Sequence, residues 1–178
     1  MIDLRAVRRY SRALFELARK KSVLEKTDPA LLRACELTEK HPEIGHLILN
    51  STISLAEKED FLEKILGPET EPLVTEFLKV LVRKKRFREL PAIQEEFHKT
   101  FEKHQGIQEV LVISAREFPE AYEEKLKAIL KRKTGFEIRL QKKTDPGLIG
   151  GFILRFDGSE INASFRARLE AIRQSLMD

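Results

Sequence analysis

The sequence predicts a mostly helical protein, with a bundle of six helices over residues 1–105 and a small α+β domain over residues 106–178. Apolar residues recur at helical spacing throughout the first part. After Gly106 the pattern changes to short β-branched runs, which alternate with helical stretches in the order β-α-β-β-α. No linker rich in glycine, serine or proline separates the two parts, so we expect the sixth helix to lead directly into the second domain.

Composition narrows the classes of protein to which the chain can belong. Of its 178 residues 42% are hydrophobic, which is enough for a buried core, and the net charge of +4 is divided equally between the two parts. Domains that bind nucleic acid usually concentrate their charge more strongly. The single cysteine, Cys35, excludes a disulfide within the chain and fits a reducing compartment. No apolar run approaches the roughly 18 residues that span a bilayer, so we expect no direct membrane insertion.

The first helix is expected over residues 3–20. On a helical wheel the charged residues share one face. These residues are Arg5, Arg8, Arg9, Arg12, Glu16 and Arg19. The opposite face is apolar or small, and its members are Leu4, Ala6, Val7, Tyr10, Ala13, Leu14, Phe15, Leu17 and Ala18. This apolar arc covers roughly 200°, about twice the width that one contact with a core requires.

The second helix is expected to begin with Asp28 as N-cap and Pro29 in the first helical position, which is a common start signal. It should end near His41, because a proline disfavours helical backbone in the residue before it. A short third helix is expected over residues 43–49.

Ser54 and Glu57 have the spacing of a capping box, so a fourth helix is expected to begin there and to end at Gly67. A fifth helix is expected over residues 72–85 and a sixth over residues 88–104. The apolar arc of the fifth helix is again roughly 200° wide. Its members are Leu73, Val74, Phe77, Leu78, Val80, Leu81 and Val82.

The second domain is expected to contain three strands and two helices. The strands are predicted over residues 107–113, 136–140 and 152–156, because each is rich in β-branched or alternating apolar residues. The helices are predicted over residues 118–133 and 165–177.

Three glycines, Gly147, Gly150 and Gly151, stand close together before the last predicted strand. The segment lacks the lysine of a phosphate-binding P-loop and the spacing of a dinucleotide-binding loop. It also precedes a strand, whereas phosphate-binding loops precede a helix. We interpret Gly150 and Gly151 as structural residues that bend a strand where the backbone packs closely, and we expect no cofactor.

RNA binding is an alternative function. The order β-α-β-β-α resembles an RNA-recognition domain without its last strand, and Phe152 and Phe156 share one face of a strand, where aromatic rings could stack on bases. Residues 83–88, RKKRFR, form the strongest basic cluster. Such a run at the end of a helix is more commonly a solvated surface that interacts favourably with the helix dipole.

No recognisable pattern of catalytic or metal-binding residues occurs in the sequence. The histidines include no pair spaced by four residues, and they are His41, His46, His98 and His104. The chain has no G-x-S-x-G motif. Cys35 stands beside apolar residues in a predicted helix, which indicates a core position. We therefore expect no catalytic residue, no metal ligand and no enzymatic activity.

The two wide apolar arcs allow two interpretations. Either both helices lie in the middle of the bundle, or one edge of each forms a groove for an amphipathic helix of a partner. Ala6 and Ala13 flank Tyr10 on one edge of the first helix, and such small residues let another helix approach closely.

The segment Arg9–Ala18, RYSRALFELA, resembles the first helix of the delta subunit of F-type ATP synthases, whose mitochondrial counterpart is the oligomycin-sensitivity-conferring protein. The family usually has alanine where this chain has Ser11. Residues 90–93, LPAI, are similar to the family's segment that opens the sixth helix.

The C-terminal part carries the most specific resemblance. The family shows G-G before alternating apolar residues, then D-x-S and a basic helix with R-L, and this chain has IGG at 149–151, NAS at 162–164 and RL at 168–169. Asn162 replaces the usual aspartate, and asparagine caps a helix as aspartate does. The resemblance covers essentially the whole chain in order and length.

The resemblance implies a non-catalytic stator subunit, present in one copy per complex, that links the catalytic head to the b subunits so that rotor torque is resisted. It implies a peripheral position at a membrane. Because no transit peptide is evident, we expect the cytoplasmic face of a bacterial cell membrane, or else a chain from which a transit peptide has already been removed. The first and fifth helices of the family hold the N-terminal helix of an alpha subunit, and the C-terminal part binds the ends of the b subunits.

Carried onto this chain, the resemblance indicates three sets of residues. The expected groove for the alpha helix consists of Ala6, Tyr10, Ala13, Leu14, Leu17, Phe77, Leu78, Leu81 and Val82. The expected contact with the b subunits consists of Phe165, Leu169 and Ile172. Gly150, Gly151, Asn162 and Ser164 are expected to be structural.

Overall fold

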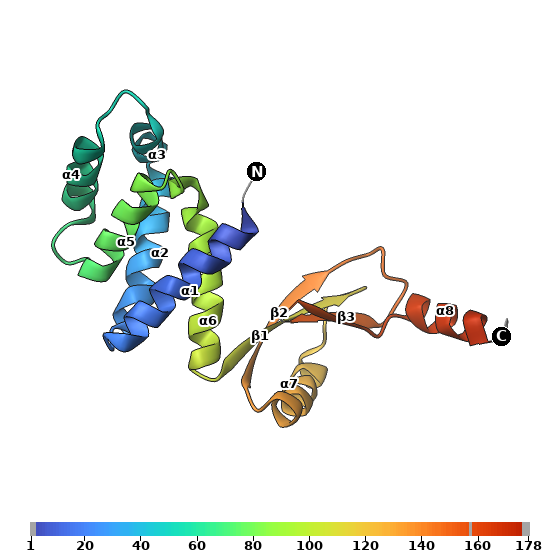
Figure 1. Cartoon of the computed structure of the whole chain (residues 1–178). Helices are drawn as coiled ribbons and strands as arrows, with labels where there is room; N and C mark the ends of the chain where they lie inside the picture. The colour runs from blue at the N-terminus through green and yellow to red at the C-terminus, as the bar shows by residue number, and fades with distance from the viewer. Residues whose placement is uncertain (1–2, 157, 176–178) are drawn as a thin grey trace. The chain divides into compact units, whose positions relative to one another are not determined.

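The computed structural model describes residues 3–156 and 158–175, except for the side chains at positions 171, 172 and 175. The chain divides into two compact units, Met1–Phe101 and Glu102–Asp178 (Figure 1). The predicted fold class is confirmed, because six helices come first and a small mixed part with a four-stranded sheet follows.

The helices of the first unit follow one another with short connections. They are α1 (Leu4–Lys20), α2 (Leu24–Lys40), α3 (Pro42–Leu49), α4 (Leu55–Leu66), α5 (Pro72–Arg83), the short 3-10 helix η1 (Phe87–Glu89) and α6 (Leu90–His104), which crosses the unit boundary. One apolar core joins them, and Leu14, Leu31, Leu78 and Phe97 lie fully inside it. The rings of Phe15 and Phe97 meet edge to face with centroids 5.9 Å apart, which packs α1 against α6.

Local signals explain where several of these helices begin and end. Asp3 caps α1, since its carboxylate accepts hydrogen bonds from the backbone N–H groups of Arg5 and Ala6. The predicted capping box between Ser54 and Glu57 is present at the start of α4. Gly67 ends α4 with a φ of 73°, in the region that favours glycine.

The predicted start of the second helix is wrong. α2 begins at Leu24, so Pro29 lies inside the helix and Asp28 is a buried residue in its second turn. Leu24 and Thr27 are buried, and the Thr27 hydroxyl donates to the Val23 carbonyl oxygen at 2.8 Å. This packing extends the helix toward its N-terminus. Pro29 has no N–H to donate to the Glu25 carbonyl oxygen, so the helix lacks one hydrogen bond in its second turn.

The second unit is a sheet with one helix on its core-forming face and a second helix at the end of the chain (Figure 1). Its elements are β1 (Ile107–Ser114), α7 (Glu120–Thr134), β2 (Glu137–Thr144), β3 (Phe152–Phe156), β4 (Ser159–Asn162) and α8 (Phe165–Ser175). The strand order is β2-β1-β3-β4. β1 and β2 are parallel and α7 connects them, whereas β3 is antiparallel to both β1 and β4. The core of this unit includes Val110, Val112, Leu130, Ile138 and Leu154.

The sequence predicts three strands, with none between residue 156 and the last helix, whereas the structure contains a fourth strand, β4, in this interval. β4 pairs with β3 at the edge of the sheet, and all four of its residues are exposed. An exposed edge strand has no buried face, so its sequence lacks the apolar alternation by which a strand is recognised.

Candidate functional site

The structure brings α1 and α5 together as antiparallel neighbours. The rings of Tyr10 and Phe77 are in edge contact, with centroids 6.5 Å apart. Arg86, just past the end of α5, donates to the carboxylate of Asp3, just before the start of α1, at 3.2 Å. The end of α5 therefore lies at the start of α1.

The nine residues predicted for the groove do not share one environment. Six are buried in the core: Ala6, Leu14, Phe77, Leu78, Leu81 and Val82. Tyr10 is half-buried, Ala13 is exposed, and Leu17 is 49% exposed. Of the nine predicted residues, only Tyr10, Ala13 and Leu17 therefore reach the surface of the chain, and the other six pack below them in the core.

One apolar strip follows from the helical spacing and the antiparallel arrangement. We call it the α1–α5 strip, and it consists of Ala6, Tyr10, Ala13 and Leu17 on α1 and Leu73, Phe77 and Val80 on α5. Residues spaced by three or four lie on one side of a helix. The contact between Tyr10 and Phe77 joins the two halves of the strip.

Val80 belongs to this strip, although it was not among the residues predicted for the groove. It is 37% exposed, which is unusual for an apolar residue of α5, where its apolar neighbours are buried. Its spacing of three from Phe77 was the available sequence signal. The wheel shows that spacing but does not show which edge of the apolar arc meets solvent.

Charged residues hold α5 against α4. Arg83 donates two hydrogen bonds to the Glu59 carboxylate, at 2.6 and 2.7 Å. These bonds lower the pKa of Glu59 and raise the pKa of Arg83. Lys79 is largely buried and pairs with Glu63 and with Glu76, and the hydrogen bond to Glu63 is the largest cause of its raised pKa.

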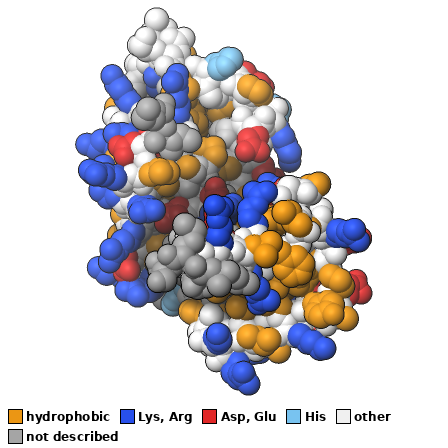
Figure 2. All heavy atoms as spheres, turned by 90° about the vertical axis from the view of Figure 1, so that its right-hand side faces the viewer, with side chains coloured by type: hydrophobic (Ala, Val, Ile, Leu, Met, Phe, Trp, Pro, Cys, Tyr) orange, Lys and Arg blue, Asp and Glu red, His pale blue; other side chains and the backbone are white. Residues whose placement is uncertain are grey.

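The predicted contact region in the second unit is exposed where the structure describes it. Phe165 is 54% and Leu169 is 63% exposed on α8, and the side chain of Ile172 lies outside the described residues. Ile149 and Ile161 are also exposed. Figure 2 shows hydrophobic side chains gathered on the surface of this unit.

Gly150 and Gly151 stand where the backbone and α8 come close together. A Cβ atom on Gly150 would lie 2.5 Å from Cδ2 of Phe165, so the ring rests on this glycine. Gly151 has a φ of 80°, and its Cβ atom would lie 2.4 Å from the Ala163 carbonyl oxygen. Both positions therefore exclude a side chain.

Asn162 and Ser164 form the start of α8. The Asn162 side chain accepts a hydrogen bond from the Ser164 N–H at 3.1 Å, and the Ser164 hydroxyl accepts one from the Ala167 N–H at 3.2 Å. The second bond has the form of an N-cap. The Phe165 N–H also donates to the Gly150 carbonyl oxygen at 3.0 Å, which joins the helix start to the glycines.

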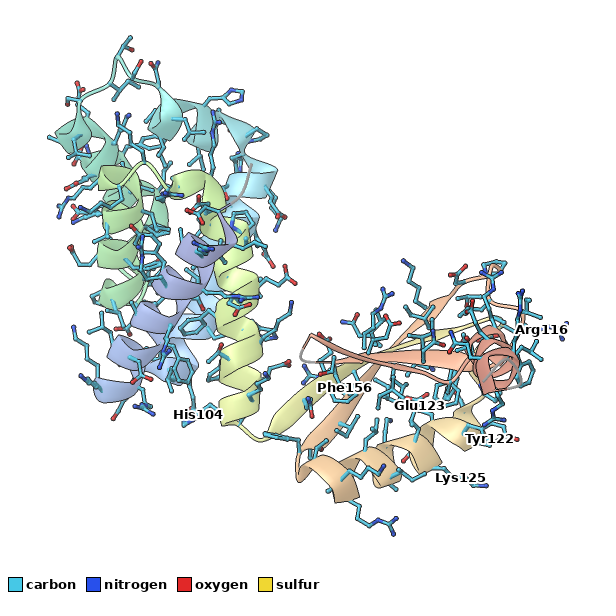
Figure 3. All side chains as sticks on the ribbon, turned by 45° about the vertical axis from the view of Figure 1, so that its right-hand side comes forward. His104, Arg116, Tyr122, Glu123, Lys125 and Phe156 are labelled. Atoms are coloured by element: carbon cyan, nitrogen blue, oxygen red, sulfur yellow. The ribbon has the colours of Figure 1, made fainter. Side chains whose placement is uncertain are left out.

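The aromatic residues of β3 do not offer an RNA-stacking platform. Phe152 packs edge to face on Phe118, with centroids 6.1 Å apart, and Phe152 and Phe156 both pack against the core that includes Leu130 of α7 (Figure 3). Their face of the sheet is therefore the covered one, which overturns the structural basis of the RNA-binding alternative.

Cys35 lies in the core, as the sequence indicates. Burial raises the pKa of its thiol to about 12, so the thiolate that a nucleophile requires is disfavoured. Among residues 3–156 and 158–175, no group of three or more His, Cys, Asp or Glu could hold a metal ion.

Both units, the helical bundle and the small α+β unit, carry exposed apolar side chains on a helix, and such surfaces are typical of proteins that bind other chains. Comparison with known proteins makes this more specific. The profile of the ATP synthase delta (OSCP) subunit family matches residues 6–176. The chain belongs to this family. It is a non-catalytic stator subunit of an F-type ATP synthase.

Individual relatives are similar over nearly their full length. ATP synthase subunit delta of Desulfitobacterium hafniense is 33% identical over 168 residues, which are 94% of each chain. That of Symbiobacterium thermophilum is 32% identical over 177 residues, 99% of this chain and 95% of the relative. A chain in the structure of the Toxoplasma gondii mitochondrial ATP synthase hexamer has the same fold, with a TM-score of 0.73 at 20% identity over 97% of both chains.

The complex to which this subunit belongs is bound to a membrane. Within the part of the chain that the structure describes, none of the helices combines the length and the apolar character needed to cross one.

Proposed function

We propose that the α1–α5 strip holds the N-terminal helix of an alpha subunit at the top of the catalytic head, and that the start of α8 binds the C-terminal ends of the b subunits. The bundle over residues 1–105 and the domain over residues 106–178 then serve one contact each. A single copy works in each complex, at the cytoplasmic face of a bacterial cell membrane.

The observation that carries the first contact is the exposure of apolar residues along one line. Ala13, Leu17 and Val80 meet solvent, and the ring contact between Tyr10 and Phe77 lies between them. An amphipathic helix covers such a line with residues spaced by three and four. The small side chain of Ala13 lets the backbone of that helix come close.

The two contacts together supply a mechanical function. Proton flow turns the rotor, and the resulting torque would turn the catalytic head unless the head is held. A protein that binds the head with one unit and the stalk with the other resists this torque, and proton flow is thereby coupled to ATP synthesis. Such a link benefits from a low dissociation rate, which burial of apolar side chains provides.

The proposal is tested by titrating the full-length protein with a synthetic peptide of the cognate alpha-subunit N-terminus. We expect chemical-shift changes confined to α1 and α5. Ala13→Arg should weaken binding by at least about tenfold, because it places bulk and charge on the strip. Calorimetry measures the affinity, and circular dichroism checks that helix content is retained.

Ala128→Arg is the matched control, since Ala128 is an exposed alanine on α7 in the other unit. It should bind the peptide as the wild type does. Equal affinity of the wild type and Ala13→Arg would refute the proposed position of the alpha helix.

A further inference from the structure

The exposed face of α1 carries a concentration of positive charge that the fold does not neutralise. Residues 3–21 contain seven basic and two acidic side chains, a formal charge of +5, whereas the whole chain has +4. Arg5, Arg8, Arg9 and Arg12 are exposed, and none of them forms an ion pair with a described residue. Figure 2 shows lysine and arginine side chains gathered along one side of the first unit, to which α1 belongs.

The position of these arginines is unfavourable for α1 itself. They occupy the first half of the helix, where the helix dipole is positive, and the first turn contains no acidic residue. The carboxylate of Asp3 is already engaged by two backbone N–H groups and by Arg86. Apart from the contact of the Arg9 guanidinium with the Tyr10 ring, these four arginines therefore have no compensating interaction in the described part of the chain.

The arginines lie beside the α1–α5 strip. The guanidinium of Arg9 is 5.3 Å from the centre of the Tyr10 ring, and the Tyr10 ring in turn contacts Phe77. Arg5 and Arg12 precede and follow Arg9 by four and three residues, so the three form one line along that edge of α1.

The turn that follows α5 adds positive charge at the same end of the strip. Lys84 and Lys85 are exposed and have no ion pair with a described residue. The contact of their neighbour Arg86 with Asp3 places this turn at the start of α1. This end of the strip is thus bordered by basic side chains from α1 and from the turn that follows α5.

We infer that the partner helix held on the α1–α5 strip is acidic at the end that lies over the start of α1, and that the arginines attract and orient it. This inference rests on the proposed function. Opposite charges on two binding surfaces raise the association rate and disfavour wrong orientations more than they slow dissociation. The reversed orientation would leave the acidic end away from the arginines.

The test compares association rates of the full-length protein with the alpha-subunit peptide at about 50 mM and about 300 mM salt. The variant Arg5→Gln/Arg8→Gln/Arg9→Gln/Arg12→Gln should associate roughly tenfold more slowly at low salt, with a smaller change in the dissociation rate and a weaker salt dependence. The control removes four exposed charges from the other unit: Lys125→Gln/Arg132→Gln/Lys133→Gln/Lys143→Gln. Lys125 projects from α7 beside Tyr122 (Figure 3).

Two further measurements leave the protein unchanged. A peptide whose acidic residues are replaced by their amides should associate with the wild-type protein about as slowly as the normal peptide associates with the arginine variant. A spin label at the acidic end of the peptide should broaden amide signals at the start of α1. Broadening at the end of α1 instead would overturn the orientation.

The outcomes separate this inference from the function on which it rests. Equal rates and equal salt dependence for wild type and arginine variant would overturn the inference while the peptide still binds. An equal decrease of the association rate in the control variant of the second unit would also overturn the inference, because the effect would then come from the net charge of the protein. Failure of the wild type to bind the peptide would overturn the proposed function.

Discussion

Ser11 and Glu89 each contain a buried polar atom without a hydrogen-bond partner in the described part of the chain. The hydroxyl of Ser11 lies on the core side of α1, and the residue is 1% exposed. One carboxylate oxygen of Glu89 accepts from Arg86 at 2.7 Å, whereas the other has no partner. Burying such an atom without a partner is unfavourable, since its hydrogen bonds to water are lost.

Ser11→Ala should therefore stabilise the protein, by about 1 kcal/mol, because it removes the unpartnered hydroxyl and improves helix propensity. Ser54→Ala is the informative comparison, since it removes the cap of α4 and should destabilise by about 1 kcal/mol. Urea unfolding measures both changes. A loss of stability in Ser11→Ala would show that the hydroxyl has a favourable contact.

The sequence predicts the helices of the candidate site better than its individual residues. Periodicity identifies the apolar side of α1 and α5, and therefore Tyr10, Ala13 and Leu17. It does not separate these from Leu78 or Leu81, which have the same chemistry but lie in the core. That difference depends on which other helices pack against each edge, and this is decided by the folded bundle.

At the scale of single elements, α4 depends strongly on charge. Leu62 is the only residue of this helix that is buried, and the ion pairs of Glu59 and Glu63 with α5 supplement its apolar contacts. The pKa of Glu59 is held below its ordinary value of 4.5 by the hydrogen bonds from Arg83. The folded state therefore holds this proton less tightly than the unfolded state does.

This difference predicts a loss of stability in acid. A carboxyl with a depressed pKa stabilises the fold above its unfolded pKa, and this stabilisation is lost as the pH falls through the folded pKa. The melting temperature should decrease below about pH 4.5, and Glu59→Gln should make the decrease smaller. Glu69→Gln, at an exposed glutamate without an ion pair to a described residue, is the control. Identical pH profiles for all three proteins would contradict this role of Glu59.

Local signals for the end of a helix agree with the structure at α4 but not at α2. The capping box at Ser54 and the glycine at position 67 mark both ends of α4 in the sequence. Asp28 and Pro29 look like a helix start as well, but Leu24 and Thr27 are held by the core and extend α2 past them. β4 is extended because it pairs with β3, and this pairing cannot be recognised from the residues of β4 alone.

For the whole molecule, the two proposed contacts belong to different units, so we expect that each can be lost without the other. Leu169→Glu places a charge on the exposed apolar surface of α8 and should weaken binding to a C-terminal fragment of the b subunits by about tenfold or more. It should leave binding of the alpha peptide unchanged. Surface plasmon resonance with each ligand measures the two affinities.

Tyr122→Glu is the matched control, because Tyr122 is an exposed large side chain of the same unit, on α7 (Figure 3). It should retain both interactions. If Leu169→Glu binds the b fragment as the wild type does, the proposed stalk contact is wrong.

Each unit is built from one uninterrupted stretch of chain, and this has a consequence for biosynthesis. The first unit ends at Phe101, so we expect it to fold on the ribosome once that residue has left the exit tunnel. In the second unit, β1 emerges first but has to wait for β2, which follows only after the whole of α7. We therefore expect the bundle to fold during translation, before the sheet is complete.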